Sequence, residues 1–154
     1  MPRDAPTANA NANAAGRPAA DPRIDRKAMI AAARAARRHA YAPYSGFRVG
    51  AAVVDERGRV HRGCNVENAS YGLTVCAERN AIGAAIVAGG RRLLAIAVAS
   101  PTSPAATPCG ACRQALVEVA DQDALVVLVP PKGVPSERHL GALLPESFAL
   151  TRRR

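Results

Sequence analysis

Three cysteines and one glutamate have the types and spacing of a metal site that also moves protons. A Cys-x-Glu motif begins at Cys76, and a Pro-Cys-x-x-Cys motif places Cys109 and Cys112 further along the chain, 33 and 36 residues after Cys76. Zinc favours a tetrahedral set of sulfur or nitrogen ligands, and three protein ligands leave the fourth position to water, as in catalytic sites. We therefore expect these cysteines to bind one Zn²⁺ and Glu78 to carry protons.

The alternative is a structural zinc site that only stabilises the fold. Such a site needs a fourth cysteine or histidine ligand. Cys64 is the one cysteine left, and we interpret it as a small buried residue. The three histidines, at positions 39, 61 and 139, do not have the spacing of ligands. The sequence therefore favours the catalytic site.

The elements that hold this site follow from the hydrophobic pattern and the turn residues. The Ala- and Arg-rich stretch Ile24–Ala40 predicts a first helix, with Asp21 or Asp25 near its start. Apolar runs between Gly- and Pro-rich turns predict strands. The expected strands are Phe47–Val54, Arg59–Glu67, Leu93–Ser100 and Ala124–Val129, and the other expected helices are Cys76–Ala88, Cys109–Ala120 and Glu137–Leu144.

An opening hairpin followed by alternating helices and strands is typical of an α/β fold with helices packed on a mixed sheet. In this order the predicted metal ligands fall at helix starts. Cys109 and Cys112, three residues apart, share one face of a first helical turn. Cys76 and Glu78 would diverge by about 200° within a regular helix, so Cys76 is predicted at the helix cap.

Helix N-termini and nearby cations suit a site with three thiolates. The site keeps a net negative charge even with Zn²⁺ bound, and the helix dipoles stabilise it. Arg79 directly follows Glu78, and Arg113 directly follows Cys112. We expect these arginines to donate hydrogen bonds to thiolate sulfur, with Arg79 in the second shell of the metal.

Length and composition predict one domain with short flanking segments. The chain has 154 residues, of which 49% are hydrophobic, and only five are aromatic. We expect a domain at residues 23–150, an Ala-, Asn- and Pro-rich disordered tail at 1–22 and a basic tail at 151–154. Because few large side chains are available for the core, we expect contacts between subunits to add stability.

Neither a membrane span nor a secretory signal is predicted. No apolar stretch reaches the roughly 18 to 20 residues of a membrane-spanning helix, and residues 1–22 lack the apolar segment of a secretory signal. We therefore expect a cytoplasmic protein. Thiols stay reduced in that compartment, so the four cysteines favour metal binding over disulfides.

The net charge of +9 is unevenly distributed along the chain. Residues 1–40 hold eight basic and three acidic residues and Arg152–Arg154 are all basic, whereas residues 41–151 hold ten basic and nine acidic residues. A nucleic-acid-binding site usually combines a basic surface with aromatic side chains. The near-neutral core therefore predicts no nucleic-acid partner beyond nonspecific attraction of the flanks to polyanions.

Five motifs in order, from about Arg26 to Phe148, resemble the small homotetrameric cytidine deaminases. The motifs are Tyr-Ala-Pro-Tyr-Ser-Gly-Phe-Arg-Val-Gly at 41–50, Gly-Cys-Asn-Val-Glu-Asn-Ala at 63–69, Cys-Ala-Glu-Arg-Asn-Ala-Ile at 76–82, Pro-Cys-Gly-Ala-Cys-Arg-Gln at 108–114 and Leu-Leu-Pro-Glu-Ser-Phe at 143–148. The motifs at 76–82 and 108–114 together also match the pattern of nucleobase deaminases, which is His or Cys before x-Glu with Pro-Cys-x-x-Cys downstream. Residues 130–140 depart from the family's hairpin-then-helix pattern.

The resemblance implies a three-layer fold with a mixed five-stranded sheet flanked by helices and one Zn²⁺ per subunit. It implies hydrolytic deamination of cytidine and deoxycytidine to uridine and deoxyuridine, a step of pyrimidine salvage. Glu78 would pass protons from the attacking water to N3 of the pyrimidine and to the leaving amine. The protein would act as a homotetramer whose sites are shared between subunits.

The resemblance also implies the residues that bind the nucleoside. Asn65 and Glu67 would hold the ribose 3′-hydroxyl, and their spacing of two at the end of a strand places both on one face. Phe47 would face the pyrimidine ring. Without the resemblance, Asn65 and Glu67 are typical solvated polar groups and Phe47 a typical core residue. The residues implied to complete a neighbouring subunit's site are Ala69, Tyr71 and Phe148.

Two other functions remain as alternatives. A deaminase of another cytosine nucleoside, such as blasticidin S, would share every catalytic residue. A deaminase of cytosine in polynucleotides is favoured only by the basic flanks, because the core does not supply the stacking aromatic residues of an open channel.

Overall fold

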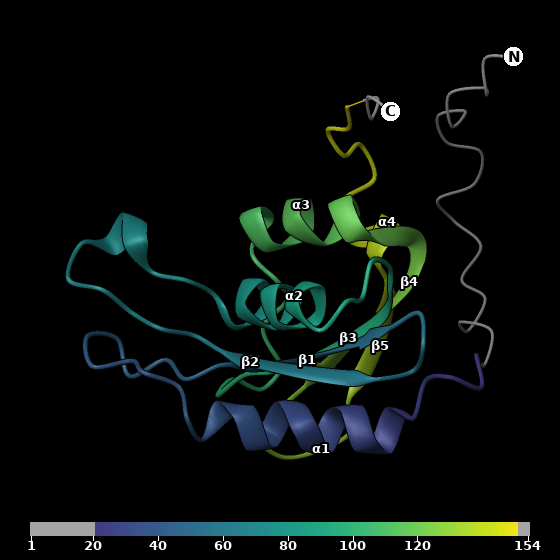
Figure 1. Ribbon diagram of the computed structural model, residues 1–154. Helices are drawn as coiled ribbons and strands as arrows, with labels where there is room; N and C mark the ends of the chain where they lie inside the picture. Colours follow the sequence, from purple (N-terminus) through teal and green to yellow (C-terminus); the bar gives the residue numbers. More distant parts are fainter. Residues whose placement is uncertain (1–20, 151–154) are drawn as a thin grey trace, which may run out of the picture.

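A computed structural model describes residues 21–150 of the chain (Figure 1). The tails predicted at 1–22 and 151–154 lie outside this range, apart from Asp21 and Pro22. Across 21–150, no helix has the length and apolar character needed to cross a bilayer. The elements in chain order are α1 (Arg26–Arg37), β1 (Gly50–Asp55), β2 (Val60–Cys64), the 3₁₀ turn η1 (Tyr71–Leu73), α2 (Ala77–Val87), β3 (Leu93–Ala99), α3 (Gly110–Val119), β4 (Ala120–Val129), β5 (Ser136–His139) and α4 (Leu140–Leu143).

The strands form one mixed sheet of five in the order β2-β1-β3-β4-β5. β3 and β4 run parallel and are joined through α3, whereas the other neighbouring pairs are antiparallel. The predicted α/β architecture with a mixed five-stranded sheet is confirmed. β4 is longer than predicted, because its hydrogen-bonded ladder with β3 already includes Ala120.

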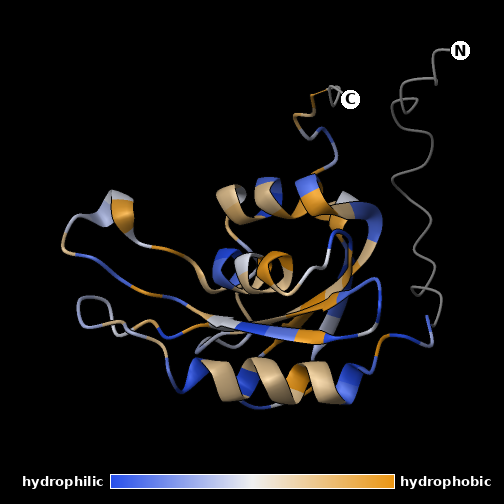
Figure 2. Ribbon diagram, viewed as in Figure 1, coloured by the Kyte–Doolittle hydropathy of each residue, from blue (hydrophilic) through white to orange (hydrophobic). Residues whose placement is uncertain are grey.

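Helices cover both faces of the sheet, so the domain has three layers (Figure 1). α1 packs on one face against a cluster that contains Ala52, Val54 and Leu125. α2 and α3 pack on the other face, where Val53 and Leu116 belong to a second cluster. Figure 2 shows the hydrophobic residues concentrated in the strands between these helices. Because alternate residues of each strand face opposite layers, the two clusters share the same strands.

Glycines let both helix layers lie directly against the first two strands of the sheet. A Cβ added to Gly63 in β2 would lie 2.3 Å from the backbone nitrogen of Ala81 and 2.5 Å from the carbonyl oxygen of Ala77, both in α2. A Cβ added to Gly50 in β1 would lie 2.2 Å from the carbonyl oxygen of Ala33 in α1. Only glycine permits these approaches, and the first of them fixes the depth of α2 and of the site at its start.

The final predicted helix is wrong in its first half. Ser136–His139 forms β5, which pairs antiparallel with β4 along Leu125–Leu128, and only Leu140–Leu143 is helical. Glu and Arg in this segment favour a helix locally, but pairing with a buried strand outweighs that propensity. Charged side chains are also typical of a sheet edge, where they discourage further strand pairing. The segment therefore has the hairpin-then-helix order of the family that the chain resembles.

Candidate active site

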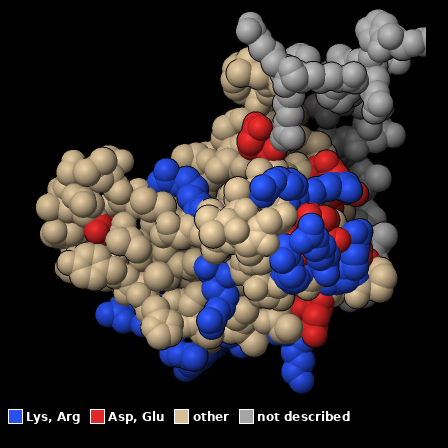
Figure 3. Space-filling view, viewed as in Figure 1, with Lys and Arg blue, Asp and Glu red and all other residues tan. Residues whose placement is uncertain are grey.

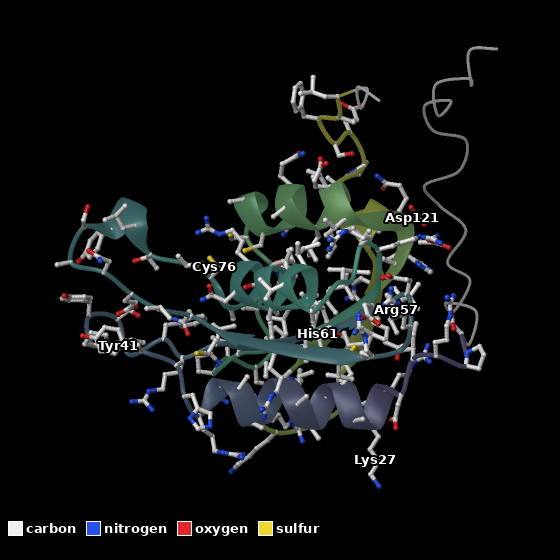
Figure 4. All side chains as sticks on the ribbon, in the orientation of Figure 1. Lys27, Tyr41, Arg57, His61, Cys76 and Asp121 are labelled. Carbon is white, nitrogen blue, oxygen red and sulfur yellow. The ribbon has the colours of Figure 1, made fainter. Side chains whose placement is uncertain are left out.

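The three predicted ligands come together at the N-termini of α2 and α3. The sulfur atoms of Cys76, Cys109 and Cys112 all lie within 4.8 Å of one another, and those of Cys76 and Cys109 are 3.9 Å apart. Cys76 is the N-cap of α2, as predicted, and Cys109 is the N-cap of α3. Cys112 is buried in the first turn of α3. Figure 4 shows Cys76 at the start of α2, with sulfur atoms beside it.

This donor set fits Zn²⁺. Sulfur ligands about 2.3 Å from zinc in a tetrahedral arrangement are about 3.8 Å from one another, close to the 3.9 Å between Cys76 and Cys109. Three thiolates are a soft donor set that zinc prefers over harder cations. The fourth cysteine, Cys64, lies in β2 and is not a member of the cluster. The geometry and chemistry of the cluster therefore fit Zn²⁺ as the cofactor.

The thiols divide into one that ionises easily and one that does not. The hydrogen bond from the Cys112 thiol is the main cause that lowers the pKa of Cys76 to about 5, and the bond from Cys109 and the positive charge of Arg79 add to it. The hydrogen bond between Cys112 and Cys76 is the main cause that raises the pKa of Cys112, and burial adds to it. At neutral pH the cluster therefore holds a preformed thiolate, and a bound metal displaces the remaining protons.

Glu78 lies beside this cluster and is almost completely buried, with 5% of its surface exposed. Burial is the main cause that raises the pKa of Glu78, and the negative charge of Cys76 adds to it, against a bond from its own backbone amide. A raised carboxyl pKa brings the group closer to the range in which it both accepts and donates protons. The geometry therefore agrees with the predicted role of Glu78.

The two arginines next to site residues have different roles. Arg79 donates a hydrogen bond to the carbonyl oxygen of Thr74, at 2.9 Å, and is close enough to Cys76 to lower its pKa. Arg113 does not bond a thiol in the structure. Its guanidinium bonds the Pro108 and Leu143 carbonyl oxygens and the Thr107 hydroxyl, at 2.7, 2.9 and 3.0 Å. It therefore fixes the loop before Cys109 to the end of α4.

Asn65 and Glu67 both bind the segment that carries Phe47. The Asn65 amide accepts from the Val49 backbone nitrogen and donates to the Phe47 carbonyl oxygen, each at 2.8 Å. The Glu67 carboxylate accepts from the backbone nitrogens of Tyr44 and Ser45, at 2.9 and 3.2 Å, and from the Ser45 hydroxyl. The Ser45 hydroxyl is the main cause that lowers the pKa of Glu67. β2 ends at Cys64, so Asn65 and Glu67 lie just beyond the strand, and both hold the loop that carries Phe47.

Residues 41–47 and 65–75 form an extension of the domain that we call the arm. It projects beyond the helices at the left of Figure 1 and is linked by isolated bridges between Tyr41, Val66 and Val75. Tyr71 is 78% exposed on the arm, and its ring meets that of Tyr44 edge to face at 6.4 Å. Ala69 is also exposed there. The arm therefore presents aromatic surface that the rest of residues 21–150 does not cover.

A pocket of about 530 Å³ opens on the arm beside Glu67. Its lining residues are Tyr44, Ser45, Glu67, Tyr71 and Thr74. Thr74 is two residues from the metal ligand Cys76, so the pocket and the cluster are joined by one short stretch of chain. The carboxylate and the hydroxyl can hydrogen-bond to hydroxyl groups of a ligand, and the aromatic rings can pack against a planar ring in the same ligand.

Phe148 lies away from this pocket. It follows α4, is 69% exposed, and its carbonyl oxygen accepts from Gln114 of α3 at 2.8 Å. It does not line the pocket beside Glu67. The structure of one chain therefore does not bring Phe148 to the predicted nucleoside-binding residues of the same chain.

A second pocket, of about 680 Å³, lies at the opposite end of the sheet and is lined by Asp121 and His139 among others. Figure 4 places Asp121 far from Cys76. None of the predicted site residues lines this pocket, so its larger volume does not make it the active site.

Sequence reasoning missed the residues that hold the site in place. Ser45 binds Glu67, and Asn80 fixes α2 to the sheet through a 2.8 Å bond to the Cys64 carbonyl oxygen. Both lie inside the motifs at 41–50 and 76–82 that resemble the family. Their contacts join segments 16 to 22 residues apart, and residue spacing alone does not indicate such contacts.

Comparison with known proteins identifies the class that this fold and site define. The family described as the cytidine and deoxycytidylate deaminase zinc-binding region matches residues 22–128. A cytidine deaminase of Halalkalibacterium halodurans is 47% identical over 125 residues, which cover 81% of this chain and 95% of that protein. The crystal structure of cytidine deaminase from Burkholderia pseudomallei matches with a TM-score of 0.77 and 50% identity, covering 81% of this chain and all of that one.

A second solved structure agrees with the first. The crystal structure of cytidine deaminase from Mycobacterium tuberculosis matches with a TM-score of 0.71 and 43% identity, covering 82% of this chain and 99% of that one. The chain therefore belongs to the zinc-binding cytidine and deoxycytidylate deaminase family. The predicted family and its fold are confirmed.

Proposed function

We propose that this protein hydrolyses cytidine and deoxycytidine to uridine and deoxyuridine with release of ammonia. The observation that carries the proposal is the cluster of Cys76, Cys109 and Cys112 within 4.8 Å, with the buried carboxyl of Glu78 two residues from Cys76. The cytidine deaminases that the chain resembles support the substrate.

Glu78 is the group that moves protons in this reaction. Zinc, when bound by the three cysteines, supplies the Lewis acid that lets water lose a proton near neutral pH. Glu78 takes that proton and donates to N3 of the pyrimidine as the oxygen attacks C4. Glu78 then takes the proton of the new hydroxyl on C4 and transfers it to the amine, so that the C4–N bond breaks, ammonia leaves and a C4 carbonyl remains. A buried carboxyl with a raised pKa suits a group that changes protonation at each step.

The arm supplies the binding of the nucleoside. The Glu67 carboxylate keeps its negative charge and lines the pocket, so it accepts a hydrogen bond from a ribose hydroxyl. Asn65 binds the same hydroxyl, and its side-chain amide also holds the loop that carries Phe47. The ring of Phe47 faces the pyrimidine ring. Free cytosine has no ribose and cannot donate a hydroxyl hydrogen bond to Glu67, so we expect it to bind less well than the nucleosides.

We propose residues 23–150 as the deaminase domain, working in the cytoplasm in pyrimidine salvage as a homotetramer. Ala69, Tyr71 and Phe148 are exposed and complete the site of a neighbouring subunit in this proposal. Large exposed aromatic side chains on a projecting arm support burial in a subunit interface. Native mass spectrometry tests the tetramer, and Tyr71→Ala should reduce both assembly and activity.

The function is tested by incubating the purified zinc protein with cytidine, deoxycytidine, cytosine and cytosine-containing single-stranded DNA. Ammonia release is expected from the two nucleosides and not from the polymer. Release from the polymer alone would refute the proposal.

A pair of variants tests the role of Glu78. Glu78→Gln should lower kcat by about 10²- to 10⁴-fold, the usual contribution of a general acid and base, while zinc content stays near one per chain. Glu146→Gln removes an exposed carboxyl after α4 and should leave kcat unchanged. If Glu78→Gln were as active as the native protein, Glu78 would not take part in the proton transfers of the reaction.

A further inference from the structure

The positive charge at the start of the chain is concentrated on a single folded helix. Residues 1–25 contain three arginines and three aspartates and are neutral in sum. α1 and its C-cap residue contain five cations and no acidic residue, so they account for the whole +5 of residues 1–40. The charge therefore does not belong to the tail, where the sequence alone suggested a nonspecific polyanion contact.

The cations form a stripe on the outer face of α1. The buried side of the helix is Met29, Ala33 and Ala36. The exposed side runs through Lys27, Ala28, Ala31, Arg34 and Arg38, which follow one another at helical spacing. Figure 4 shows Lys27 pointing from α1 away from the sheet. Small alanines between the cations leave the surface open to close approach.

Two more arginines extend this stripe. The carbonyl oxygen of Arg48 accepts a hydrogen bond from Arg37, which places the exposed Arg48 beside the C-terminal end of α1. Arg62 pairs with Ala52, whose side chain belongs to the cluster under α1, so Arg62 faces the same layer at the edge of the sheet. We call Lys27, Arg34, Arg38, Arg48 and Arg62 the basic ridge.

The ridge is not neutralised within the described chain. Across residues 21–150, Arg26 pairs with Glu137 at 2.9 Å, but no residue of the basic ridge forms an ion pair. Figure 3 shows Lys and Arg along the lower border of the molecule, over α1. Cations in the last turn stabilise a helix through its dipole. Lys27 lies in the first turn, where the interaction of a positive charge with the dipole is unfavourable. Helix stability therefore does not explain the whole ridge.

We propose that the basic ridge binds the phosphate backbone of double-helical nucleic acid without reading its sequence. Lys27 to Arg38 spans about 16 Å of helix, enough to reach phosphates on both sides of a major groove about 12 Å wide. An anionic membrane fits less well, because the exposed face of α1 carries no large apolar side chain that would enter the lipid. Uncompensated charge on a rigid helix is complementary to phosphate.

The bound nucleic acid is not the substrate of the deaminase. α1 lies on one face of the sheet, and α2 and α3, which carry the metal ligands, lie on the other (Figure 1). The ridge therefore attaches the enzyme to a polymer while its active site stays free for small molecules.

The experiment measures binding of the whole zinc protein to a labelled 20-base-pair DNA by fluorescence anisotropy, from 50 to 200 mM NaCl. Five phosphate contacts predict a slope of about −4.5 for log K against log salt, or about 500-fold weaker binding over this range. A variant with Lys27→Gln, Arg34→Gln and Arg38→Gln keeps two contacts. Its slope should be about −1.8, or about 12-fold, with ammonia release from cytidine unchanged.

A matched control removes the same net charge elsewhere. Arg23, Arg57 and Arg92 pair with Asp21, Glu56 and Asp121, so their change to Gln should leave the slope near −4.5. Equal flattening by both triple variants would show that only total charge matters and would overturn the proposal. No DNA binding at 50 mM NaCl would overturn it as well. The proposal would also be overturned if the ridge variant lost binding to phosphatidylserine vesicles but kept its binding to DNA.

Discussion

Gly63 sets how closely α2 approaches the sheet, and Gly63→Ala is the sharpest test of how the site is positioned. The added Cβ would lie 2.3 Å from the Ala81 nitrogen and 2.5 Å from the Ala77 carbonyl oxygen. Ordinary contact begins at 3.4 Å, so α2 must move by about 1 Å. The atoms in the way are helix backbone, which cannot turn aside as a side chain would. We expect a cost of about 1 to 3 kcal/mol in the free energy of unfolding.

The same displacement reaches the active site. Ala77 lies between the proposed metal ligand Cys76 and the proposed proton carrier Glu78, so both residues move with the first turn of α2. A misplacement of about 1 Å in a catalytic group can cost roughly 100-fold in rate. We therefore expect Gly63→Ala to lower kcat/KM for cytidine by about 10- to 100-fold and the melting temperature by about 2 to 12 °C.

Urea unfolding, calorimetry and steady-state kinetics measure these effects. Gly83→Ala is the control, because Gly83 is exposed in the same helix and an added Cβ would meet no atom within 4 Å. This variant should be more stable by about 0.5 to 1 kcal/mol, since alanine favours a helix over glycine, and should keep full activity. A Gly63→Ala protein with native stability and native kcat/KM would refute the reasoning about the packing of α2.

Three further predictions concern binding, acid stability and the metal. Glu67→Gln should raise the KM for cytidine about tenfold or more, and Ser45→Ala, which removes the hydroxyl donor to Glu67, should raise it less. A KM equal to that of the native protein in Glu67→Gln would show that Glu67 does not bind the nucleoside. Burial raises the pKa of Asp55, but hydrogen bonds from His61 and backbone amides outweigh it and lower the pKa to about 2 from 3.8. The ionised group therefore adds about 2 kcal/mol of stability above pH 4, which is lost as the pH falls to about 2, and urea unfolding should show no such loss in Asp55→Asn. After chelation of zinc, Cys76 should react with iodoacetamide at nearly the same rate from pH 6 to 8, and a tenfold rise per pH unit would contradict its pKa of about 5.

The elements that carry the metal ligands could be predicted from the sequence because their signals are local. Asp25 caps α1 by accepting from the Ala28 nitrogen at 2.9 Å. α2 ends before Gly89, whose φ of 87° suits a helix C-terminus. The spacing of Cys109 and Cys112 placed both in one turn, and the spacing of Cys76 and Glu78 placed Cys76 at the cap. Each of these features depends on residues within four positions of one another.

Features that depend on distant partners were not predictable in this way. Glu137 and Arg138 are helix formers by themselves, and only the neighbouring strand β4 makes them part of β5. Arg113 stands beside a metal ligand, but Leu143, thirty residues away, accepts one of its hydrogen bonds instead of a thiol. The charge of residues 1–40 is a different case, because its +5 lies within Arg26–Arg38, inside the helix that the sequence already predicts.

The two halves of the candidate site are held in different ways, and this difference constrains how the enzyme works. The cysteines and Glu78 stand at helix starts that are packed on the sheet, so the metal half is rigid without a partner. The arm is held by isolated bridges and by the bonds of Glu67 and Asn65 to one loop, and its aromatic residues are exposed. Few buried contacts mean low local stability. Metal binding should therefore survive in a dissociated subunit, whereas nucleoside binding requires the arm to be covered. Dilution that dissociates the proposed homotetramer should raise the KM for cytidine while zinc content stays at one per chain.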